Sequence, residues 1–502
     1  MFMTNETIVT EKSFNNSSKL VQNEAVVKLA HENVHGVVLR ASGIFYYKKN
    51  NDFKTSFSFL NYWKIKRNVP VTIICSIRNL DGRLIKREEI KFEKSDVMNY
   101  VPNLPEISFE GSVEIEIFSL VDMVIPYAGI LVIYQSKFGT SMTHTYGRTY
   151  SSYEIEEGNT LSKCEETCCH SLLPKNAGKS YVIFHNGSQI TPKQEVVLSL
   201  LNYLDERIET TINLPPLNPY QTIKIDPSEC FENYYAFLHE NPGNVSISFS
   251  LNNTAFPRML TVNETHDGSD FQVNHSNFNL SKTTAPKLEN NQFGHMNPVN
   301  LDGLETDLIV YPDCEDGEYE VIYENEVAAN FNKNHFVSVK MNSTTTNFVK
   351  FAKINDNVPI RIHTGLRISK SPERLPSESC HGIWHNQCPP KRFHWLMVSE
   401  NQKNYSRVVF RSFSDDFANL KDKKDIPLIL KLYSEKSFEV KEVSINPSEL
   451  VNGKRLGDIF VDAEKFLGDS FGWLTIFSEY PYCEAYGTIE NTHGSIAYEH
   501  SF

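Results

Sequence analysis

Cysteine and tryptophan are scarce in this sequence, whose 502 residues include 9 Cys and 4 Trp. An odd number of thinly spread cysteines is typical of reduced cytosolic thiols and argues against a disulfide framework. No stretch approaches the roughly 20 apolar residues of a membrane helix, so no transmembrane segment is predicted. The first 21 residues of the segment 1–35 are polar and lack the basic and apolar parts of a secretory signal. We therefore expect a poorly ordered leader there and a cytoplasmic protein.

Clusters of positive charge are also missing. Asp and Glu number 62 against 49 Lys and Arg, which sets the formal net charge at −13. Nucleic-acid binding needs Lys and Arg gathered against phosphates, and an anionic membrane surface attracts the same residues. The sequence therefore predicts no nucleic-acid partner and no basic footing on a membrane.

Common catalytic signatures are absent as well. The sequence has no Gly-x-Ser-x-Gly elbow, no phosphate-binding glycine loop, no dinucleotide-binding turn and no His-Glu-x-x-His zinc motif. This lowers the expectation of an enzyme, although it leaves open an enzyme with a motif of its own.

Strand-forming patterns fill most of the chain. Aromatic residues, which favour strands, include 32 Phe and 23 Tyr. Apolar and polar residues alternate in stretches such as 71–77, 112–118 and 196–202, and Asn-, Gly- and Pro-containing turns separate them. No sustained helical period accompanies them. The fold class predicted is all-β, with tandem β-sandwich domains that are Ig-like or jelly-roll-like.

An internal repeat is indicated by three short strand-like runs that end in histidine. They end at His144, His275 and His500, and each histidine is followed by Thr or Ser. Each run follows a Gly-initiated alternating strand, which begins at Gly111, Gly243 or Gly472. Three signals in the same order favour a repeated domain. The longer interval before His500 leaves space for one more domain, which shows no obvious terminal histidine.

These signals predict seven segments. In chain order they are a leader (1–35), sandwich repeat 1 (36–150), a connector with a cysteine cluster (151–177), sandwich repeat 2 (178–282), a linker (283–302), an intermediate β unit with a His/Cys/Trp loop (303–392) and sandwich repeat 3 (393–502).

The three repeated histidines suggest two roles. Neutral imidazoles bind metals, and three of them with an open position suit catalytic Zn or Fe. Alternatively, each histidine closes its own sandwich by hydrogen-bonding a backbone carbonyl. The structural role is the simpler one, because equivalent positions in successive domains lie far apart unless the domains form a closed ring.

Two Cys/His clusters are further metal candidates. The connector carries Cys164, Cys168, Cys169 and His170, but this spacing matches no strong zinc-finger pattern, and buried free thiols are the favoured interpretation. The stretch 374–395 is interpreted as a loop because Pro and Gly punctuate it. Its possible Cys2His2 zinc ligands are Cys380, His381, His385 and Cys388.

The same stretch suits a carbohydrate. Aromatic rings stack on sugar faces and guanidinium groups hold carboxylates or phosphates, so Trp384, Trp395, Arg374 and Arg392 are candidate ligand-binding residues. Packing of these side chains against a neighbouring sandwich is the alternative.

A recognition or scaffolding protein is the leading functional hypothesis, with a glycan or a protein as its ligand. The alternative is a metal-dependent enzyme that uses Zn or Fe at the repeated histidines or at the Cys/His loop. Glu378 or Glu499 would then transfer protons. A structural assembly component is a third possibility.

Overall fold

A computed structural model describes most of the chain. The described residues are 38–123, 129–144, 147–150, 161–170, 178–252, 256–278, 292–297, 299–311, 316–335, 337–341, 349–359, 362–384, 392–412, 426–480 and 483–501. The expected leader, residues 1–35, lies outside them. Strands dominate, and within this part of the chain they form eight antiparallel sheets. The predicted all-β class of tandem sandwiches is therefore confirmed.

Repeat 1 (residues 40–150) consists of two sheets with strand orders β4-β3-β6-β1-β9 and β5-β2-β7-β8. A short helix, α3, follows β2. Its elements are β1 (Arg40–Lys49), β2 (Lys54–Leu60), α3 (Tyr62–Arg67), β3 (Thr72–Asn79), β4 (Leu84–Ile90), β5 (Val97–Tyr100), β6 (Phe109–Phe118), β7 (Leu131–Gln135), β8 (Thr140–Thr143) and β9 (Gly147–Tyr150).

Repeat 2 (residues 161–278) has the sheet orders β13-β12-β15-β10-β18 and β14-β11-β16-β17. Two short helices precede β15. Its elements are β10 (Leu161–His170), β11 (Gly178–His185), β12 (Gln194–Leu201), β13 (Arg207–Leu214), β14 (Thr222–Ile225), α4 (Pro227–Cys230), α5 (Tyr234–Leu238), β15 (Gly243–Asn252), β16 (Phe256–Thr265), β17 (Phe271–His275) and β18 (Asn277–Phe278).

The expected intermediate unit is the third of four sandwiches and is called repeat 3 (residues 294–381) from here on, so that the expected repeat 3 (393–502) becomes repeat 4. Repeat 3 has the sheet orders β19-β24-β21-β22 and β23-β20-β25-β26. Its elements are β19 (Gly294–Met296), β20 (Glu305–Val310), β21 (Tyr319–Tyr323), β22 (Glu326–Phe331), β23 (Val337–Met341), β24 (Val349–Lys353), β25 (Thr364–Ser369) and β26 (Ser377–His381).

Repeat 4 (residues 393–500) has the sheet orders β27-β32-β29-β30 and β31-β28-β33-β34. Its elements are β27 (Phe393–Val398), β28 (Asn404–Ser412), β29 (Leu428–Tyr433), β30 (Val440–Ile445), the 3-10 helix η3 (Pro447–Glu449), β31 (Lys454–Arg455), α6 (Leu456–Ile459), α7 (Ala463–Leu467), β32 (Gly472–Phe477), β33 (Cys483–Asn491) and β34 (Ile496–His500).

All four repeats share one topology. Apart from the flanking strands β9 and β18, each has the order fourth–third–sixth–first in one sheet and fifth–second–seventh–eighth in the other. The intermediate unit, for which the sequence shows no obvious terminal histidine, thus has the same topology as the other three. Repeat 3 was missed because its first strand is only three residues long and its last is followed by Gly382, where the other units have Ser or Thr.

Several expected boundaries also change. The stretch 161–170, expected within a connector, forms β10 and pairs with β15 over its whole length. Gly294–Met296, expected in a linker, is strand β19. The expected loop 374–395 contains β26 and the start of β27. In each case a strand was missed because alternation is masked by cysteines, charged residues or short length.

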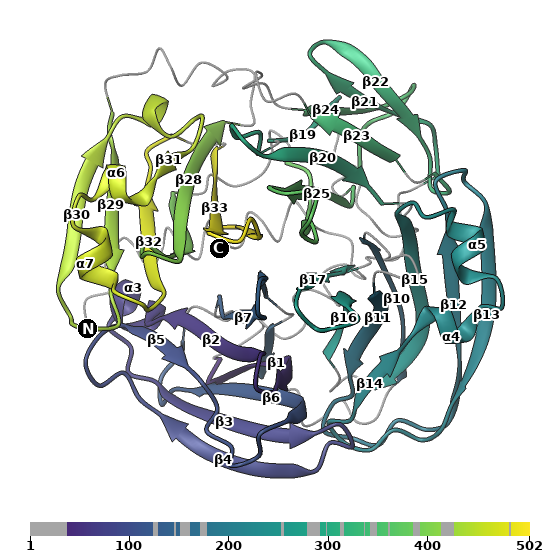
Figure 1. Cartoon of the computed structure of the whole chain (residues 1–502), viewed down its shortest axis with the longest axis horizontal. Helices are drawn as coiled ribbons and strands as arrows, with labels where there is room; N and C mark the ends of the chain where they lie inside the picture. The colour runs from purple at the N-terminus through teal and green to yellow at the C-terminus, as the bar shows by residue number, and fades with distance from the viewer. Residues whose placement is uncertain are drawn as a thin grey trace.

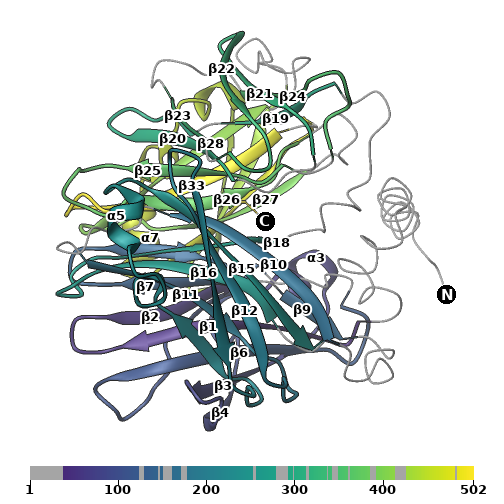
Figure 2. The same ribbon diagram turned by 90° about the vertical axis from the view of Figure 1, so that its right-hand side faces the viewer.

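The four sandwiches are arranged in a closed ring (Figure 1). The strand pairs β3/β4, β12/β13, β21/β22 and β29/β30 lie at the rim, and the C-terminus ends near the centre. Rim strands alternate: successive residues of β13 are exposed and half-buried almost to its end, as expected for a sheet with one face in water. Figure 2 shows the ring from the side.

The eighth strands of the repeats, β8, β17, β26 and β34, are here called the inner strands. β17 contacts β8 and β26, and β34 contacts the same two strands, so the inner strands surround the ring axis. Every residue of β8, β17 and β26 is buried. These strands carry many polar side chains, such as Ser141, Gln272 and Glu378. The ring therefore has a buried polar axis, whose groups need hydrogen-bond partners.

Apolar side chains close the seams between repeats. One core cluster combines repeat 1 with Tyr181 and Phe271 of repeat 2 and with Trp395 and Trp473 of repeat 4. The seam between repeats 4 and 1 joins segments far apart in sequence. There Tyr62 packs edge-on against Trp395 and Trp473, with ring centroids 5.0 and 5.9 Å away. None of the helices in the described part of the chain has the length and apolar character that crossing a membrane requires.

Candidate metal centre

The inner strands bring the three repeated histidines to one point. His144 directly follows β8, His275 ends β17 and His500 ends β34. The ring centroids of His144 and His275 are 4.2 Å apart, and those of His144 and His500 are 5.1 Å apart. Equivalent positions of separate sandwiches meet here because the ring is closed and the inner strands surround its axis.

One carboxylate joins the histidines. Donor atoms of His144, His275, Glu499 and His500 all lie within 4.8 Å of one another, and these residues are here called the axial cluster. Glu499 Oε2 is 3.3 Å from His144 Nδ1, and its Oε1 is 3.5 Å from His500 Nε2. Donors bound at roughly 2.1 Å to one divalent ion lie roughly 3–4 Å apart. The axial cluster is therefore close to the size of a loaded site.

Two of the histidines are oriented by their own backbone. Nδ1 of His275 lies 2.9 Å from the carbonyl oxygen of Ser276, and Nδ1 of His500 lies 3.0 Å from that of Ser501. A carbonyl oxygen only accepts, so Nδ1–H donates and Nε2 keeps its lone pair. This is the usual arrangement of a metal-binding histidine. The predicted hydrogen bond to a carbonyl and the predicted convergence on a metal are thus compatible.

Buried His275 offers a free ligand atom. Its side chain is 2% exposed, and within the described structure its Nε2 has no hydrogen-bond partner. An unsatisfied buried nitrogen costs stability, about 1–3 kcal/mol, unless some group binds it. A cation between His275 and Glu499 would satisfy both.

Burial keeps the imidazoles of His144 and His275 neutral. It lowers the pKa of His144 and that of His275 well below the ordinary value of 6.5. For His144 the neighbouring positive charge of Arg258 acts in the same direction, and for His275 the second cause is His144. Neutral imidazole is the form that binds a metal, so protons compete weakly for the site.

Access is uneven around the axial cluster. The side chains of His144 and Glu499 are 7% and 4% exposed, whereas that of His500 is 26% exposed. The His500 side is therefore the side from which an ion or a small ligand can enter.

The inner strand of repeat 3 also ends in a histidine, so each of the four repeats places one histidine near the axis. His381 ends β26, the inner strand of repeat 3, and its ring centroid is 5.2 Å from that of His500. Its Nε2 lies 3.1 Å from the hydroxyl of Tyr498. Burial lowers its pKa to about 3. His381 was predicted as a zinc ligand of the 374–395 stretch, and its place as the repeat-equivalent histidine was missed.

A hydrogen-bonded network surrounds Glu378 on the other face of β26. Its Oε1 accepts from Tyr311 Oη at 2.8 Å and from Asn274 Nδ2 at 3.0 Å. Burial raises the pKa of Glu378 to about 7, although nearby Arg367 acts against this. On the face of β26 that carries His381, Ser379 Oγ donates to Glu499 at 2.9 Å, so repeat 3 also contacts the axial cluster.

The predicted Cys2His2 set is not assembled by its described members. Cys380 Sγ lies 3.1 Å from Tyr311 Oη, whereas His381 faces Tyr498 and His500. Because the two side chains contact different groups, these two neighbours do not converge on one point. His385 and Cys388 lie outside the described residues. For the cysteine cluster 164–170 only the backbone is described, as β10.

The predicted carbohydrate-binding side chains make contacts with different parts of the molecule. Trp395 is 6% exposed and packs on Tyr62. Arg374 Nε donates to the carbonyl oxygen of His493 at 3.0 Å, and Arg392 pairs with Glu479 at 3.5 Å. Trp384 forms a backbone bridge with His295. Packing, the alternative interpretation, accounts for Trp395.

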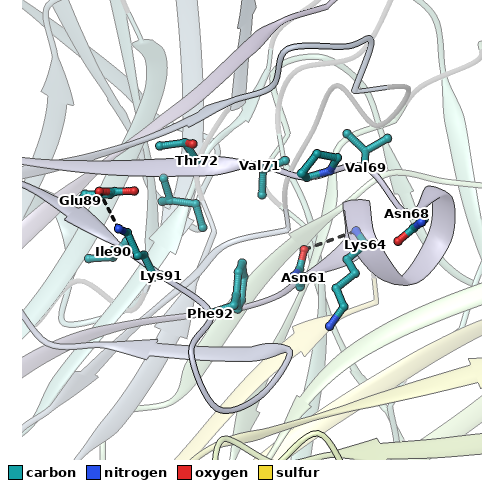
Figure 3. A pocket seen from close by; sticks show the side chains of 12 residues that line it. Asn61, Lys64, Asn68, Val69, Val71, Thr72, Glu89, Ile90, Lys91 and Phe92 are labelled. Atoms are coloured by element: carbon teal, nitrogen blue, oxygen red, sulfur yellow. Dashed lines mark hydrogen bonds and ion pairs between the residues drawn. The ribbon is translucent and has the colours of Figure 1, made fainter.

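A separate cleft of about 510 Å³ lies in repeat 1 between α3 and strands β3 and β4 (Figure 3). Its lysines are paired within the protein: Lys64 Nζ is 2.9 Å from Asp96, and Lys91 Nζ is 3.1 Å from Glu89. These pairs leave little net charge to select a ligand, and no residue of the axial cluster lines the cleft.

Comparison with protein-family models finds no match, and no curated protein is significantly similar to the chain. A function for this chain is therefore inferred from the geometry of the axial cluster.

Proposed function

We propose that this protein is a metalloprotein whose functional centre is one divalent transition-metal ion held by His144, His275, His500 and Glu499. The convergence of their four donor atoms within 4.8 Å carries the proposal. Three imidazoles and one carboxylate are a donor set for zinc or iron, whereas soft ions prefer thiolates.

A reactive centre is favoured over a closed structural one. Structural zinc sites are four-coordinate and closed, while catalytic sites keep an open position for water or substrate. The 26% exposure of the His500 side chain supports such an opening. A metal-dependent enzyme is therefore the proposed class. Beside the four protein donors, a fifth position would hold a water or substrate oxygen, which the ion would polarise.

Glycan or protein recognition, the leading hypothesis from sequence, stays a prediction. We favour the metal centre because burial of Trp395 removes one of the two proposed sugar-stacking rings from the surface. Arg374 and Arg392 are already engaged with His493 and Glu479.

Elemental analysis of the purified full chain tests the proposal. We expect about one equivalent of zinc or iron, retained through gel filtration because a buried centre holds its ion tightly. His275→Ala should reduce the metal content at least about tenfold, because even the loss of a second-shell partner costs about 10–100-fold in metal affinity and His275 is a ligand. The matched control is His185→Ala, which removes another fully buried histidine of repeat 2, one bound to Thr222.

The proposal is wrong if the wild-type chain, incubated with zinc or iron and then freed of excess ion, retains less than about a tenth of an equivalent. It is equally contradicted if His185→Ala and His275→Ala lose metal to the same extent, since the loss would then reflect general destabilisation.

A further inference from the structure

His381 occupies a special place beside the axial cluster. It is the repeat-3 equivalent of the three ligand histidines, yet it is not among the four residues whose donors lie within 4.8 Å of one another. Its ring is 5.2 Å from the ring of His500. The pseudo-symmetry of the ring therefore supplies a fourth imidazole next to the site but outside its ligand set.

Tyr498 holds His381 in this position. The Tyr498 hydroxyl is 3.1 Å from His381 Nε2, and its side chain is fully buried. Tyr498 and His500 are two residues apart on β34 and so share one face of the strand. A neutral imidazole has one N–H, so the tautomer in which Nε2 accepts from the Tyr498 hydroxyl carries the ring N–H of His381 on Nδ1.

The location of His381 matches the accessible side of the centre. His500 is the partly exposed member of the axial cluster, and His381 is its neighbour. His381 is itself 8% exposed, and Tyr486 lies against it with ring centroids 5.9 Å apart. These closely packed rings favour a small ligand over a large one.

This inference rests on the proposed function. We propose that the open metal position binds water or a small anion, and that His381, oriented by Tyr498, donates a hydrogen bond from Nδ1–H to that ligand. His381 is a specificity-determining residue for the exogenous ligand and not a metal ligand. The arrangement resembles an anion hole: a cation supplies the charge, and a fixed N–H supplies direction.

Azide binding to the cobalt(II)-loaded full chain tests this role, with the visible cobalt bands as the readout. We expect His381→Ala to retain one cobalt ion per chain but to raise the azide dissociation constant about tenfold, equivalent to ~1.4 kcal/mol. His381→Asn, which keeps an N–H donor, should recover part of the affinity. Tyr498→Phe should weaken azide binding in the same direction with cobalt content unchanged.

The outcomes separate the two proposals. Wild-type protein that takes up no cobalt removes the proposed function before azide is added, and this inference with it. Cobalt uptake with unchanged azide affinity in His381→Ala and Tyr498→Phe overturns only the role of His381. If His381→Ala loses cobalt while His185→Ala keeps it, His381 is itself a metal ligand, and its proposed role as a hydrogen-bond donor to the exogenous ligand is wrong.

Discussion

The histidines of this protein show how position in the fold decides the chemistry of one residue type. His185 and His275 are both buried in repeat 2, and in both the pKa is lowered by burial. His185 Nδ1 bonds Thr222 Oγ1 at 3.0 Å inside a single sandwich. His275 lies on an inner strand and meets histidines of other repeats. We therefore propose His275, and not His185, as a metal ligand.

A pH-dependent stability follows from His185. Burial lowers its pKa to about 3 from an ordinary value of 6.5. Between about pH 3 and pH 6.5, His185 is protonated in the unfolded chain and neutral in the folded chain. The free energy of unfolding therefore falls as pH falls below about 6.5. In urea titrations at several pH values, the free energy of unfolding of His185→Asn should fall less steeply with decreasing pH than that of wild type. The two slopes should differ by at most about 1.4 kcal/mol per pH unit.

Glu378 affects the pH dependence of stability in the opposite direction, because its pKa is raised. Comparing wild type with His185→Asn cancels this contribution, since both proteins contain Glu378. That carboxyl is protonated in the folded state up to a pH of about 7, so its contribution to stability is lost as pH rises from its ordinary value of 4.5 through 7. Identical pH slopes in both proteins would contradict the role assigned to His185.

At the scale of elements, the inner strands differ from the rim strands in what covers them. The rim strand β13 alternates, whereas β17 is buried at every residue. Polar side chains on β17 therefore need hydrogen-bond partners on the neighbouring inner strands. Gln272 illustrates this: its Nε2 donates to the carbonyl oxygens of Thr140 on β8 and Ile496 on β34, at 3.4 and 3.3 Å.

Replacing Gln272 tests whether such bonds tie the inner strands together. Gln272→Leu should lower the free energy of unfolding by about 1–3 kcal/mol, because two buried carbonyls lose their donor. Urea denaturation followed by fluorescence measures the change. The control is Gln194→Leu, since Gln194 is half-buried and bonds Ser250 within repeat 2. An equal or larger effect of the control variant would refute this account.

Elements also show where sequence similarity misleads. Ile225-Asp-Pro-Ser-Glu229 and Ile445-Asn-Pro-Ser-Glu449 look like matching positions of two repeats. Each does begin a short helical turn, capped by Asp226 or Asn446. However, the first follows the fifth strand of its repeat, β14, and the second follows the fourth, β30. Local capping chemistry alone explains the likeness.

At the scale of the whole molecule, ring closure assembles the axial cluster. His144 belongs to repeat 1 and Glu499 and His500 to repeat 4, on opposite sides of the seam between the chain's most distant parts. That seam contains Trp473, which is fully buried and donates from Nε1 to Ser58 Oγ at 2.9 Å. The metal hypothesis therefore predicts that seam packing and metal content are coupled.

Trp473→Ala tests this coupling. Truncating a buried Trp costs about 3–5 kcal/mol, and here the loss falls on the contact between repeats 4 and 1. We expect an increased radius of gyration in X-ray scattering and a loss of bound metal, although Trp473 is not a ligand. Trp473→Phe should retain most of the metal. Full metal content in an opened Trp473→Ala ring would show that the ion does not depend on closure.

Alternation and repeated strand ends are local signals, so they suffice to predict the all-β sandwich class and to single out His144, His275 and His500. The folded chain adds that these histidines meet, that Glu499 joins them, and that repeat 3 contributes His381. Convergence depends on ring closure, which arises from contacts between residues hundreds of positions apart, such as Tyr62 with Trp473. Local periodicity carries no information about such contacts, so the geometry of the axis had to come from the fold.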